Sequence, residues 1–279
     1  MKPIATPLTL AADALAVTGS KGGVGKSNLA INLAIALARW GRRVLLVDGD
    51  LGLASLDILL GLVPERTVEH LVRGEATIDE LLVEGPAGVR VLPAASGLPD
   101  LARLDEPARR RLLEALARQR PRADHVLVDT GAGLNEASLS LQLAAARVIV
   151  VTTPEPPSLV DAYATLKVLW SADPGKEADL VVNSVSDESE ALEAYRQIAR
   201  AAGHFLGREP GYLGAVRSDP HVREAVRRQR AVADLFPDSR AARSYEEIAL
   251  RVAARQSGTA PGDGYWRRLL GSSFSEVPQ

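Results

Sequence analysis

The stretch LAVTGSKGGVGKS, residues 15–27, decides the fold of this 279-residue chain. Its apolar start predicts a strand, its glycine-rich middle predicts a loop, and residues 28–39 predict a helix. GKS at 25–27 matches the end of the phosphate-binding pattern G-x-x-x-x-G-K-[ST], although Ser20 stands where that pattern has its first glycine. Glycines let backbone N–H groups surround a phosphate, and the following helix N-terminus adds a positive dipole. The stretch therefore predicts a nucleotide-binding loop rather than an ordinary turn.

Two lysines lie in this loop, and they need different targets. Lys26 is expected to bridge oxygens of the terminal phosphates, and the Ser27 hydroxyl is expected to ligate Mg²⁺. Lys21 stands near the start of the loop. Because one lysine already serves the phosphates, we expect the second to act elsewhere.

Composition places the chain among globular proteins. It is 24% charged with a formal net charge of −2, which gives no general attraction to nucleic acid or to anionic membranes. The chain has no cysteine, which excludes disulfides and thiolate metal sites. No apolar run reaches the roughly 18 residues of a membrane-spanning helix, and the N-terminus lacks a signal-peptide pattern. These features predict a cytoplasmic protein.

Short β-branched runs alternate with longer amphipathic stretches along the chain. Strands are expected at 15–18, 44–48, 89–93, 125–129, 148–152, 180–183 and 212–216. Helices are expected at 27–39, 67–82, 105–119, 135–145, 158–171, 188–202, 219–229 and 241–255. This alternation predicts a three-layer α/β fold, a doubly wound and mainly parallel sheet with helices on both faces. We expect one catalytic domain at 14–255, a leader at 1–13, a linker at 256–263 and a tail at 264–279.

Carboxylates end two of the expected strands. Asp48 and Asp50 follow one apolar run, and Asp129 ends another. Since ligands of open parallel sheets gather at the carboxyl ends of the strands, all three are expected near the phosphate loop. Asp129 then matches the aspartate that helps to bind Mg²⁺ in phosphate-loop enzymes. The like charges of Asp48 and Asp50 call for a nearby cation. The alternative is that these aspartates only cap or shape turns.

Longer segments around these residues resemble one family. KGGVGKS at 21–27 is similar to the deviant phosphate loop of the MinD/ParA family of dimeric ATPases. DGDLGLASLDILLGL at 48–62, DTGAG at 129–133 and TTPEPPSLVDAYATLK at 152–167 resemble its flagellar branch, called FlhG, FleN or YlxH. The similarity spans roughly residues 14–255.

The resemblance implies a role for each matching charged residue. Lys21 would reach across a dimer interface to the ATP of the partner. Asp50 would position or activate the hydrolytic water. Asp48 and Asp129 would support Mg²⁺ and the moving loops. The implied catalytic residues are Asp50, Lys21 and Lys26, and the implied metal ligands are Ser27, Asp48 and Asp129.

The resemblance also implies which residues bind the nucleotide. Asn183 would contact the adenine, with a strand-end turn as the alternative. Glu155 would approach the nucleotide from the opposite subunit, or else be an ordinary surface residue. The full set is Gly22, Gly23, Val24, Gly25, Lys26, Ser27, Asn28, Asn183 and Glu155.

A function and partners follow from the same resemblance. It implies a slow, Mg²⁺-dependent ATPase that dimerises with ATP and regulates flagellar number or placement. The implied partners are a second copy, the flagellar GTPase FlhF, and flagellar regulators or basal-body proteins. Residues 1–13 contain no glutamine, so the glutamine-containing docking motif of some flagellar members is missing. Alternatives are a ParA-type DNA partition ATPase and a MinD-type ATPase that positions the division site. A nitrogenase-reductase-like enzyme is excluded, because its iron–sulfur cluster needs cysteines.

The C-terminal tail has more than one interpretation. Trp266, Leu269 and Leu270 share one face of a helix, with arginines toward the other face. MinD-like proteins have a similar short membrane-targeting helix, so we expect reversible binding to anionic membranes. Packing against the domain and disorder are the alternatives.

A basic group near the C-terminal end of the domain is also open to interpretation. A solvated helix face is the simplest interpretation, and a partner-docking surface or a nucleic-acid surface are the alternatives, although nucleic acid is not favoured by the net charge. The group consists of Arg223, Arg227, Arg228 and Arg230.

Overall fold

The computed structural model describes residues 13–19, 21–50, 56–66, 68–93, 123–132 and 136–255. Its strands are β1 Asp13–Thr18, β2 Val44–Gly49, β3 Val83–Glu84, β4 Arg90–Leu92, β5 His125–Thr130, β6 Arg147–Thr152, β7 Glu177–Val185 and β8 Gly211–Arg217. Its α-helices are α1 Lys26–Arg39, α2 Leu56–Leu60, α3 Val68–Arg73, α4 Ile78–Leu81, α6 Glu136–Ala144, α7 Pro156–Ala172, α8 Glu188–Leu206, α9 Pro220–Arg227, α10 Val232–Leu235 and α11 Arg240–Ala254. A short 3₁₀ helix spans Pro86–Gly88.

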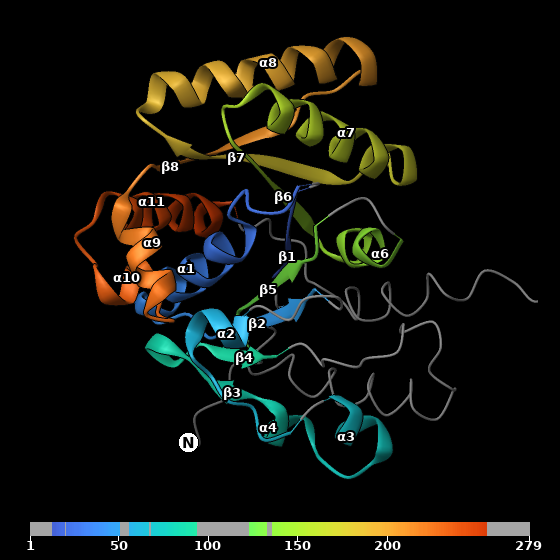
Figure 1. Cartoon of the computed structure of the whole chain (residues 1–279). Helices are drawn as coiled ribbons and strands as arrows, with labels where there is room; N and C mark the ends of the chain where they lie inside the picture. Colours follow the sequence, from blue (N-terminus) through green and yellow to red (C-terminus); the bar gives the residue numbers. More distant parts are fainter. Residues whose placement is uncertain are drawn as a thin grey trace, which may run out of the picture.

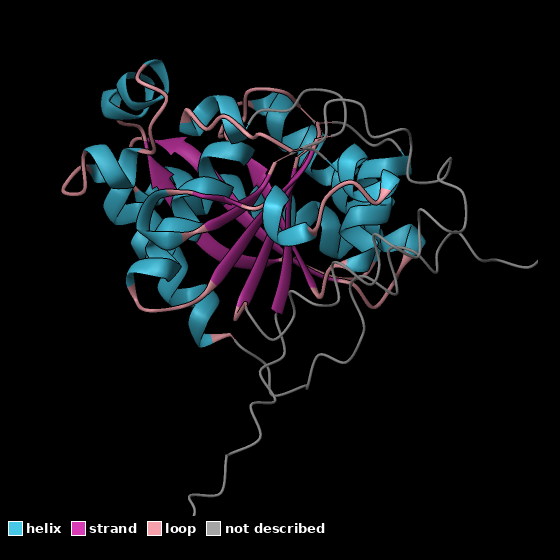
Figure 2. Ribbon diagram, turned by 90° about the horizontal axis from the view of Figure 1, so that it is seen from below, coloured by secondary structure: helices cyan, strands magenta, loops and turns pink. Residues whose placement is uncertain are grey.

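The strands form one sheet in the order β3-β4-β2-β5-β1-β6-β7-β8. Neighbours are parallel throughout, except that β3 runs antiparallel to β4. Helices cover both faces, with α1, α9, α10 and α11 on one side and α6, α7 and α8 on the other (Figure 1; Figure 2). The predicted three-layer, doubly wound and mainly parallel fold is therefore confirmed.

The side chains of each central strand alternate between two cores. In β1, Ala14 and Ala16 pack in one buried cluster with residues of α6, α7 and α8. Leu15 and Val17 pack in the other cluster with residues of α1, α10 and α11. Because both faces of the sheet are covered, these strands are apolar at nearly every position. This explains why the sequence shows continuous apolar runs rather than an alternating pattern.

The structure corrects some of the predicted elements. The single helix predicted at 67–82 is wrong, because Gly74 has a left-handed φ of 76° and separates α3 from α4. Thr77 then restarts the chain as α4 with a capping box to Glu80. The short elements β3, α2 and α10 were not predicted, because a few residues carry too little periodicity to be recognised. The predicted helix at 105–119, the linker and the tail lie outside the described residues.

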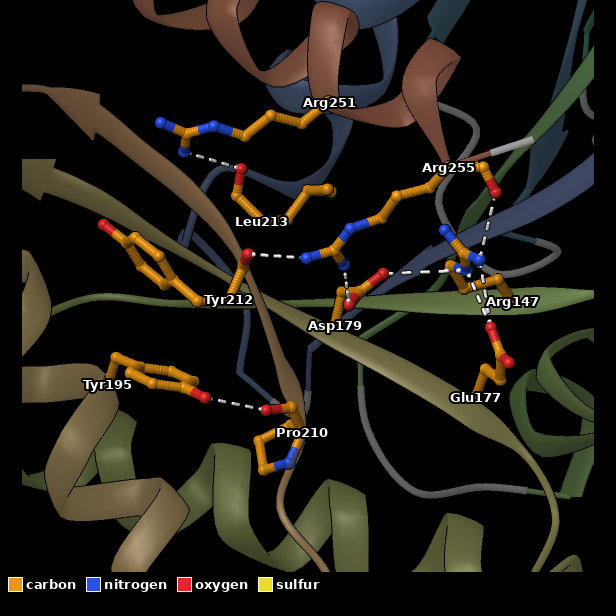
Figure 3. Close-up of polar contacts among 9 residues, drawn as sticks. All are labelled: Arg147, Glu177, Asp179, Tyr195, Pro210, Tyr212, Leu213, Arg251 and Arg255. Carbon is orange, nitrogen blue, oxygen red and sulfur yellow. Dashed lines mark hydrogen bonds and ion pairs between the residues drawn. The ribbon is translucent and has the colours of Figure 1, made fainter. Parts of the chain in front are cut away.

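Charged side chains at the amino end of the sheet form a network that joins neighbouring elements (Figure 3). Buried Asp179 of β7 pairs with Arg255, the residue that follows α11, and lies 3.7 Å from Arg147 Nε at the start of β6. The second guanidinium nitrogen of Arg255 donates to the carbonyl oxygen of Tyr212 at 3.1 Å. Arg147 also donates to the Arg255 carbonyl oxygen at 3.4 Å, so the end of α11 is bound to the three adjacent strands β6, β7 and β8. No helix among the described residues has the length and apolarity that crossing a membrane requires.

Candidate nucleotide-binding site

The predicted phosphate loop connects β1 to α1 at the carboxyl end of the sheet. Gly22 and Gly23 are exposed and Val24 is buried, while Ser27 and Asn28 are half-buried in the first turn of α1. Gly25 caps the helix with a left-handed φ of 97°. A Cβ atom at Gly25 would also lie 2.2 Å from Asn183 Nδ2. Glycine is therefore required there both by conformation and by space.

Lys26 is buried in the loop. Its Nζ donates a hydrogen bond to the Lys21 carbonyl oxygen at 3.1 Å, so the ammonium group lies within the turn of the loop. Burial lowers the pKa of Lys26, and the charges of Asp129 and Asp50 oppose that effect. The side chain is placed where a phosphate bound by the loop would meet it. Lys21 itself is exposed.

Asp48 accepts hydrogen bonds from a residue just after β2 and from the first residue of α2. It is buried, and its Oδ1 accepts from the Asp50 backbone N–H at 3.1 Å. Its Oδ2 accepts from the Leu56 N–H at 3.1 Å. Asp48 therefore binds both ends of the segment between Asp50 and α2.

Asp129 is the buried carboxylate of the site. It lies opposite Asp48 in the register of β2 and β5 and is 1% exposed. Burial is the main cause that raises its pKa to about 7, and the charges of Asp48 and Asp50 add to the shift. A hydrogen bond from Ser27 and the charge of Lys26 work in the opposite direction. Its Oδ1 has no hydrogen-bond partner among the described residues.

These donors fit a hard divalent cation. A buried, unsatisfied carboxylate oxygen beside a serine hydroxyl offers the oxygen ligands that Mg²⁺ takes. Across the described residues, no group of three or more His, Cys, Asp or Glu side chains is arranged to chelate a metal. Mg²⁺ in phosphate-loop enzymes takes few protein ligands and completes its shell with phosphate oxygens and water, so the two observations agree.

Asp50 lies beside the loop that follows β5. A Cβ atom placed on Gly131 would be 3.0 Å from Asp50 Oδ1, so the carboxylate contacts the backbone of that loop. The loop is also bound to α6, because Ser138 Oγ donates to the Gly131 carbonyl oxygen at 3.4 Å. The Asp50 carboxylate therefore lies against Gly131, the first residue after β5.

Asn183 binds the phosphate loop directly. Its Nδ2 donates to the Val24 carbonyl oxygen at 2.8 Å. Ser184 follows with a left-handed φ of 61°, which is uncommon for a residue with a side chain. The sequence predicted an adenine contact, and the structure adds a bond between the end of β7 and the loop.

Glu155 lies at the N-cap position of α7 and is exposed. A hydrogen bond with the Thr153 side chain is the main cause that lowers the pKa of Glu155, and the charge of Lys21 contributes. The charge of Lys21 thus acts on Glu155 within one subunit. The structure brings all the predicted site residues to the carboxyl end of the sheet.

Two supporting residues were missed by sequence reasoning. Gln142 of α6 donates from Nε2 to the Thr18 hydroxyl at 2.9 Å, and both side chains are buried. This bond ties α6 to the last residue of β1, immediately before the phosphate loop. A signal was present, because Ser138 and Gln142 are polar residues one helical turn apart in an otherwise mainly apolar helix.

The geometry defines a P-loop NTPase, and the comparisons give its family. The ParA family, described as "NUBPL iron-transfer P-loop NTPase", matches residues 11–253. The chain belongs to this ParA/MinD family of P-loop NTPases. The predicted family is therefore confirmed.

Flagellar and division proteins are among the similar sequences. "Antiactivator FleN" of Pseudomonas aeruginosa is 39% identical over 238 residues, which are 85% of each chain. "Flagellum site-determining protein YlxH" of Helicobacter pylori is 31% identical and covers 92% of this chain and 89% of its own. The septum site-determining protein MinD of Bacillus subtilis is 30% identical, with 86% and 88% covered.

Solved structures of MinD have the same fold. The cell division ATPase MinD of Pyrococcus furiosus superposes with a TM-score of 0.71 at 27% identity, covering 86% of this chain and 98% of its own. MinD of Pyrococcus horikoshii, solved with Mg-ADP, gives a TM-score of 0.70 at 25% identity, covering 89% and 100%.

Proposed function

We propose that the chain is an ATP-switched, dimerising ATPase that regulates flagellar number or placement. One observation supports the site: the buried Asp129 Oδ1 has no hydrogen-bond partner in the part of the chain that the structure describes, and it lies close to Ser27 and Lys26 at the phosphate loop. That arrangement is suited to a nucleotide triphosphate with a divalent cation. The flagellar role is supported by the names of the similar FleN and YlxH proteins.

Each residue of the candidate site is proposed to have a separate role in binding or hydrolysing the nucleotide. The backbone of the glycine loop and Lys26 bind and neutralise the phosphates, and Ser27 with Asp129 would hold Mg²⁺, which supplies charge neutralisation when bound. Asp48 accepts hydrogen bonds from the backbone N–H groups of Asp50 and Leu56. Asp50 is proposed to orient the attacking water, because its carboxylate contacts the loop after β5 that faces the site.

Lys21 is proposed to couple nucleotide state to assembly. Its Nζ is not needed inside its own loop, because Lys26 occupies that position. A lysine that reaches a terminal phosphate in a second copy would stabilise the dimer only while that phosphate is present. Glu155 lies near Lys21 and is proposed to face the same dimer interface.

Partners and location are part of the proposal. A second copy is the first partner, and FlhF, flagellar regulators or basal-body proteins are the further ones. The tail at 264–279 is proposed to bind anionic membranes reversibly, so that the protein divides its time between cytoplasm and membrane. Two tails on one dimer bind more tightly than one, since the second attaches at a high effective concentration.

Flagellar counting tests the biological role. In the native host, deleting the gene is expected to change the number or position of flagella seen by electron microscopy. Wild-type protein and Lys167→Ala, which removes an exposed lysine of α7, should restore the pattern. Lys21→Ala should not restore it at equal protein level. Unchanged flagella in the deletion strain would refute the proposal.

DNA binding tests the partition alternative. A ParA-type partition ATPase binds random duplex DNA with ATP and with strong salt dependence. We expect no such binding in a gel-shift assay with ATP. ATP-dependent retardation that disappears with added salt would favour the partition function.

A further inference from the structure

Asn32, in the middle of α1, is a completely buried polar side chain, at 0% exposed. Ile31, Leu33 and Ala233 around it belong to one apolar cluster, and an amide buried among apolar groups lowers stability unless its polar atoms are bound. Its Nδ2 donates to the Asn28 carbonyl oxygen at 2.7 Å, and its Oδ1 accepts from the Ala233 N–H at 2.8 Å. One side chain therefore joins α1 to α10.

The two partners of Asn32 belong to different parts of the molecule. Asn28 is the third residue of α1, in the helical turn that follows the phosphate loop. Ala233 is the second residue of α10, whose N-cap residue Ala231 makes no side-chain bond to the helix. The first N–H groups of a helix have no partner within the helix, so Asn32 supplies from α1 the acceptor that Ala231 lacks. The position of α10 therefore depends on that of α1.

The segment before α9 is bound to a second part of the candidate site, the end of β7. The Ser218 N–H donates to the Val185 carbonyl oxygen at 2.8 Å, two residues beyond Asn183, which binds the phosphate loop. Asp219 then caps α9 by accepting from the His221 N–H at 2.9 Å. We call residues 218–235 the α9–α10 unit. Its start lies beside the strand end that contacts the phosphate loop.

The joint between α9 and α10 contacts a third part, the end of α2. A Cβ atom placed on Gly61 would lie 3.3 Å from the Gln229 carbonyl oxygen, so the two backbones are in contact there. Gln229 has a left-handed φ of 53°, which is uncommon for a residue with a side chain. The other end of α2 begins at Leu56, whose N–H is bound by Asp48. The unit is thus in contact with the helix that follows the Asp48–Asp50 segment.

These contacts connect the α9–α10 unit to the phosphate helix, to the end of β7 and to α2, and Figure 1 shows α9 and α10 beside α1. An apolar side chain at position 32 would fill the core without needing partners, whereas the amide specifies one arrangement of α10 relative to the first turns of α1. A ligand that changes the conformation of those turns would also change the preferred position of α10.

We propose that Asn32 is a positioning residue that couples nucleotide binding at the phosphate loop to the α9–α10 unit. The inference rests on the proposed nucleotide site and goes beyond it, because Asn32 acts through Asn28 and Ala233. The exposed Arg223 and Arg227 of α9 would change position with the unit when nucleotide binds.

Hydrogen exchange of the full chain tests the coupling, with and without a non-hydrolysable ATP analogue and Mg²⁺. Binding stabilises the whole folded chain, so α8, on the other face of the sheet, is the internal reference. In the wild type, we expect the analogue to slow exchange in the α9–α10 unit at least about fivefold more than in α8. Asn32→Leu keeps the branched shape of the side chain and removes both bonds. This variant should bind the analogue but lose the difference between the unit and α8.

Ser244→Ala is the matched control. Ser244 is also buried, and its Oγ accepts from the Arg217 N–H at 3.3 Å and donates to the Arg240 carbonyl oxygen at 3.0 Å. The control therefore loses two hydrogen bonds to the backbone, as Asn32→Leu does, but neither of them involves α1 or α10. We expect it to keep the nucleotide-dependent difference, which a general loss of stability would not allow.

The outcomes separate the coupling from the nucleotide site itself. If the wild type does not bind the analogue in a fluorescence titration, the proposed function is refuted and the inference with it. If the wild type binds but the unit responds no more than α8, the coupling alone is overturned, and this comparison needs no variant. A difference that persists in Asn32→Leu, or that is lost equally in Ser244→Ala, would also overturn it. Loss of analogue binding in Asn32→Leu would overturn it too, by assigning Asn32 to binding instead.

Discussion

Two aspartates are buried at opposite ends of the sheet, and the protein compensates their negative charges differently. Asp179, near the start of β7, is 5% exposed and is neutralised by Arg255 and Arg147 (Figure 3). Asp129, near the end of β5, is 1% exposed and forms no ion pair among the described residues, whereas Asp179 Oδ2, which like Asp129 Oδ1 accepts no hydrogen bond there, lies 3.7 Å from Arg147 Nε. A buried charge that the protein leaves unsatisfied costs stability. We therefore expect the amino end of the sheet to be structural and the carboxyl end to bind a ligand.

The largest effect should come from breaking the neutralised pair. Asp179→Ala leaves the Arg147 guanidinium, 14% exposed, without its buried partner, while the Glu177 contact is on the surface. We expect a loss of about 3 kcal/mol in the free energy of unfolding, since Arg255 is 38% exposed and can turn to solvent. ATP binding well below the midpoint should be retained. A chemical denaturation midpoint equal to wild type would contradict the structural role.

The corresponding change at the carboxyl end of the sheet, Asp129→Asn, should lower activity rather than stability. Asp129→Asn removes a buried charge whose Oδ1 has no hydrogen-bond partner in the described ranges, so the metal-free protein should be at least as stable as wild type near neutral pH. Hydrolysis of ATP with Mg²⁺ should fall at least about 100-fold, or roughly 2.7 kcal/mol. Destabilisation of the metal-free variant to the level of Asp179→Ala would show that Asp129 is structural too.

A smaller and more selective effect is expected at Asp50. Asp50→Ala keeps the phosphate loop, Lys26 and Asp129, so binding of an ATP analogue should be unchanged. Turnover should fall at least about tenfold, or about 1.4 kcal/mol, because the water loses its orienting group. With hydrolysis blocked, light scattering should show a dimer in ATP and a monomer in ADP. Equal losses of binding and turnover would contradict the role assigned to Asp50.

A second substitution, at Lys21, tests what holds the ATP-dependent dimer together. In the Asp50→Ala background, Lys21→Ala should abolish the ATP-dependent dimer while nucleotide binding stays measurable. The reason is that the Nζ of Lys26, and not that of Lys21, is bound within the turn of the loop, where it donates to the Lys21 carbonyl oxygen. An unchanged dimer in the double variant would remove the basis for a contact between subunits.

The carboxyl end of the sheet was predictable from sequence, and the amino end was not. The phosphate loop, Asp48 and Asp129 follow apolar runs, and parallel strands bring such ends together whatever the intervening chain does. The pairing of Asp179 with Arg255 joins residues far apart in the sequence, and nothing local marks either of them. The same holds for the bond from Asn183 to Val24, which depends on how β7 lies beside the loop.

A pH dependence of stability separates the two aspartates. The pKa of Asp129 is raised from 3.8 to about 7 in the folded chain, so between these values the folded state binds more protons than the unfolded state. Stability without metal and nucleotide must then fall as pH rises through this window, by up to about 1.4 kcal/mol per pH unit from this group. Asp129→Asn should remove that slope, whereas Asp179→Asn should keep it. Unfolding free energies between about pH 5 and 7 test this difference. Parallel wild-type and Asp129→Asn curves would show that Asp129 does not titrate in that range.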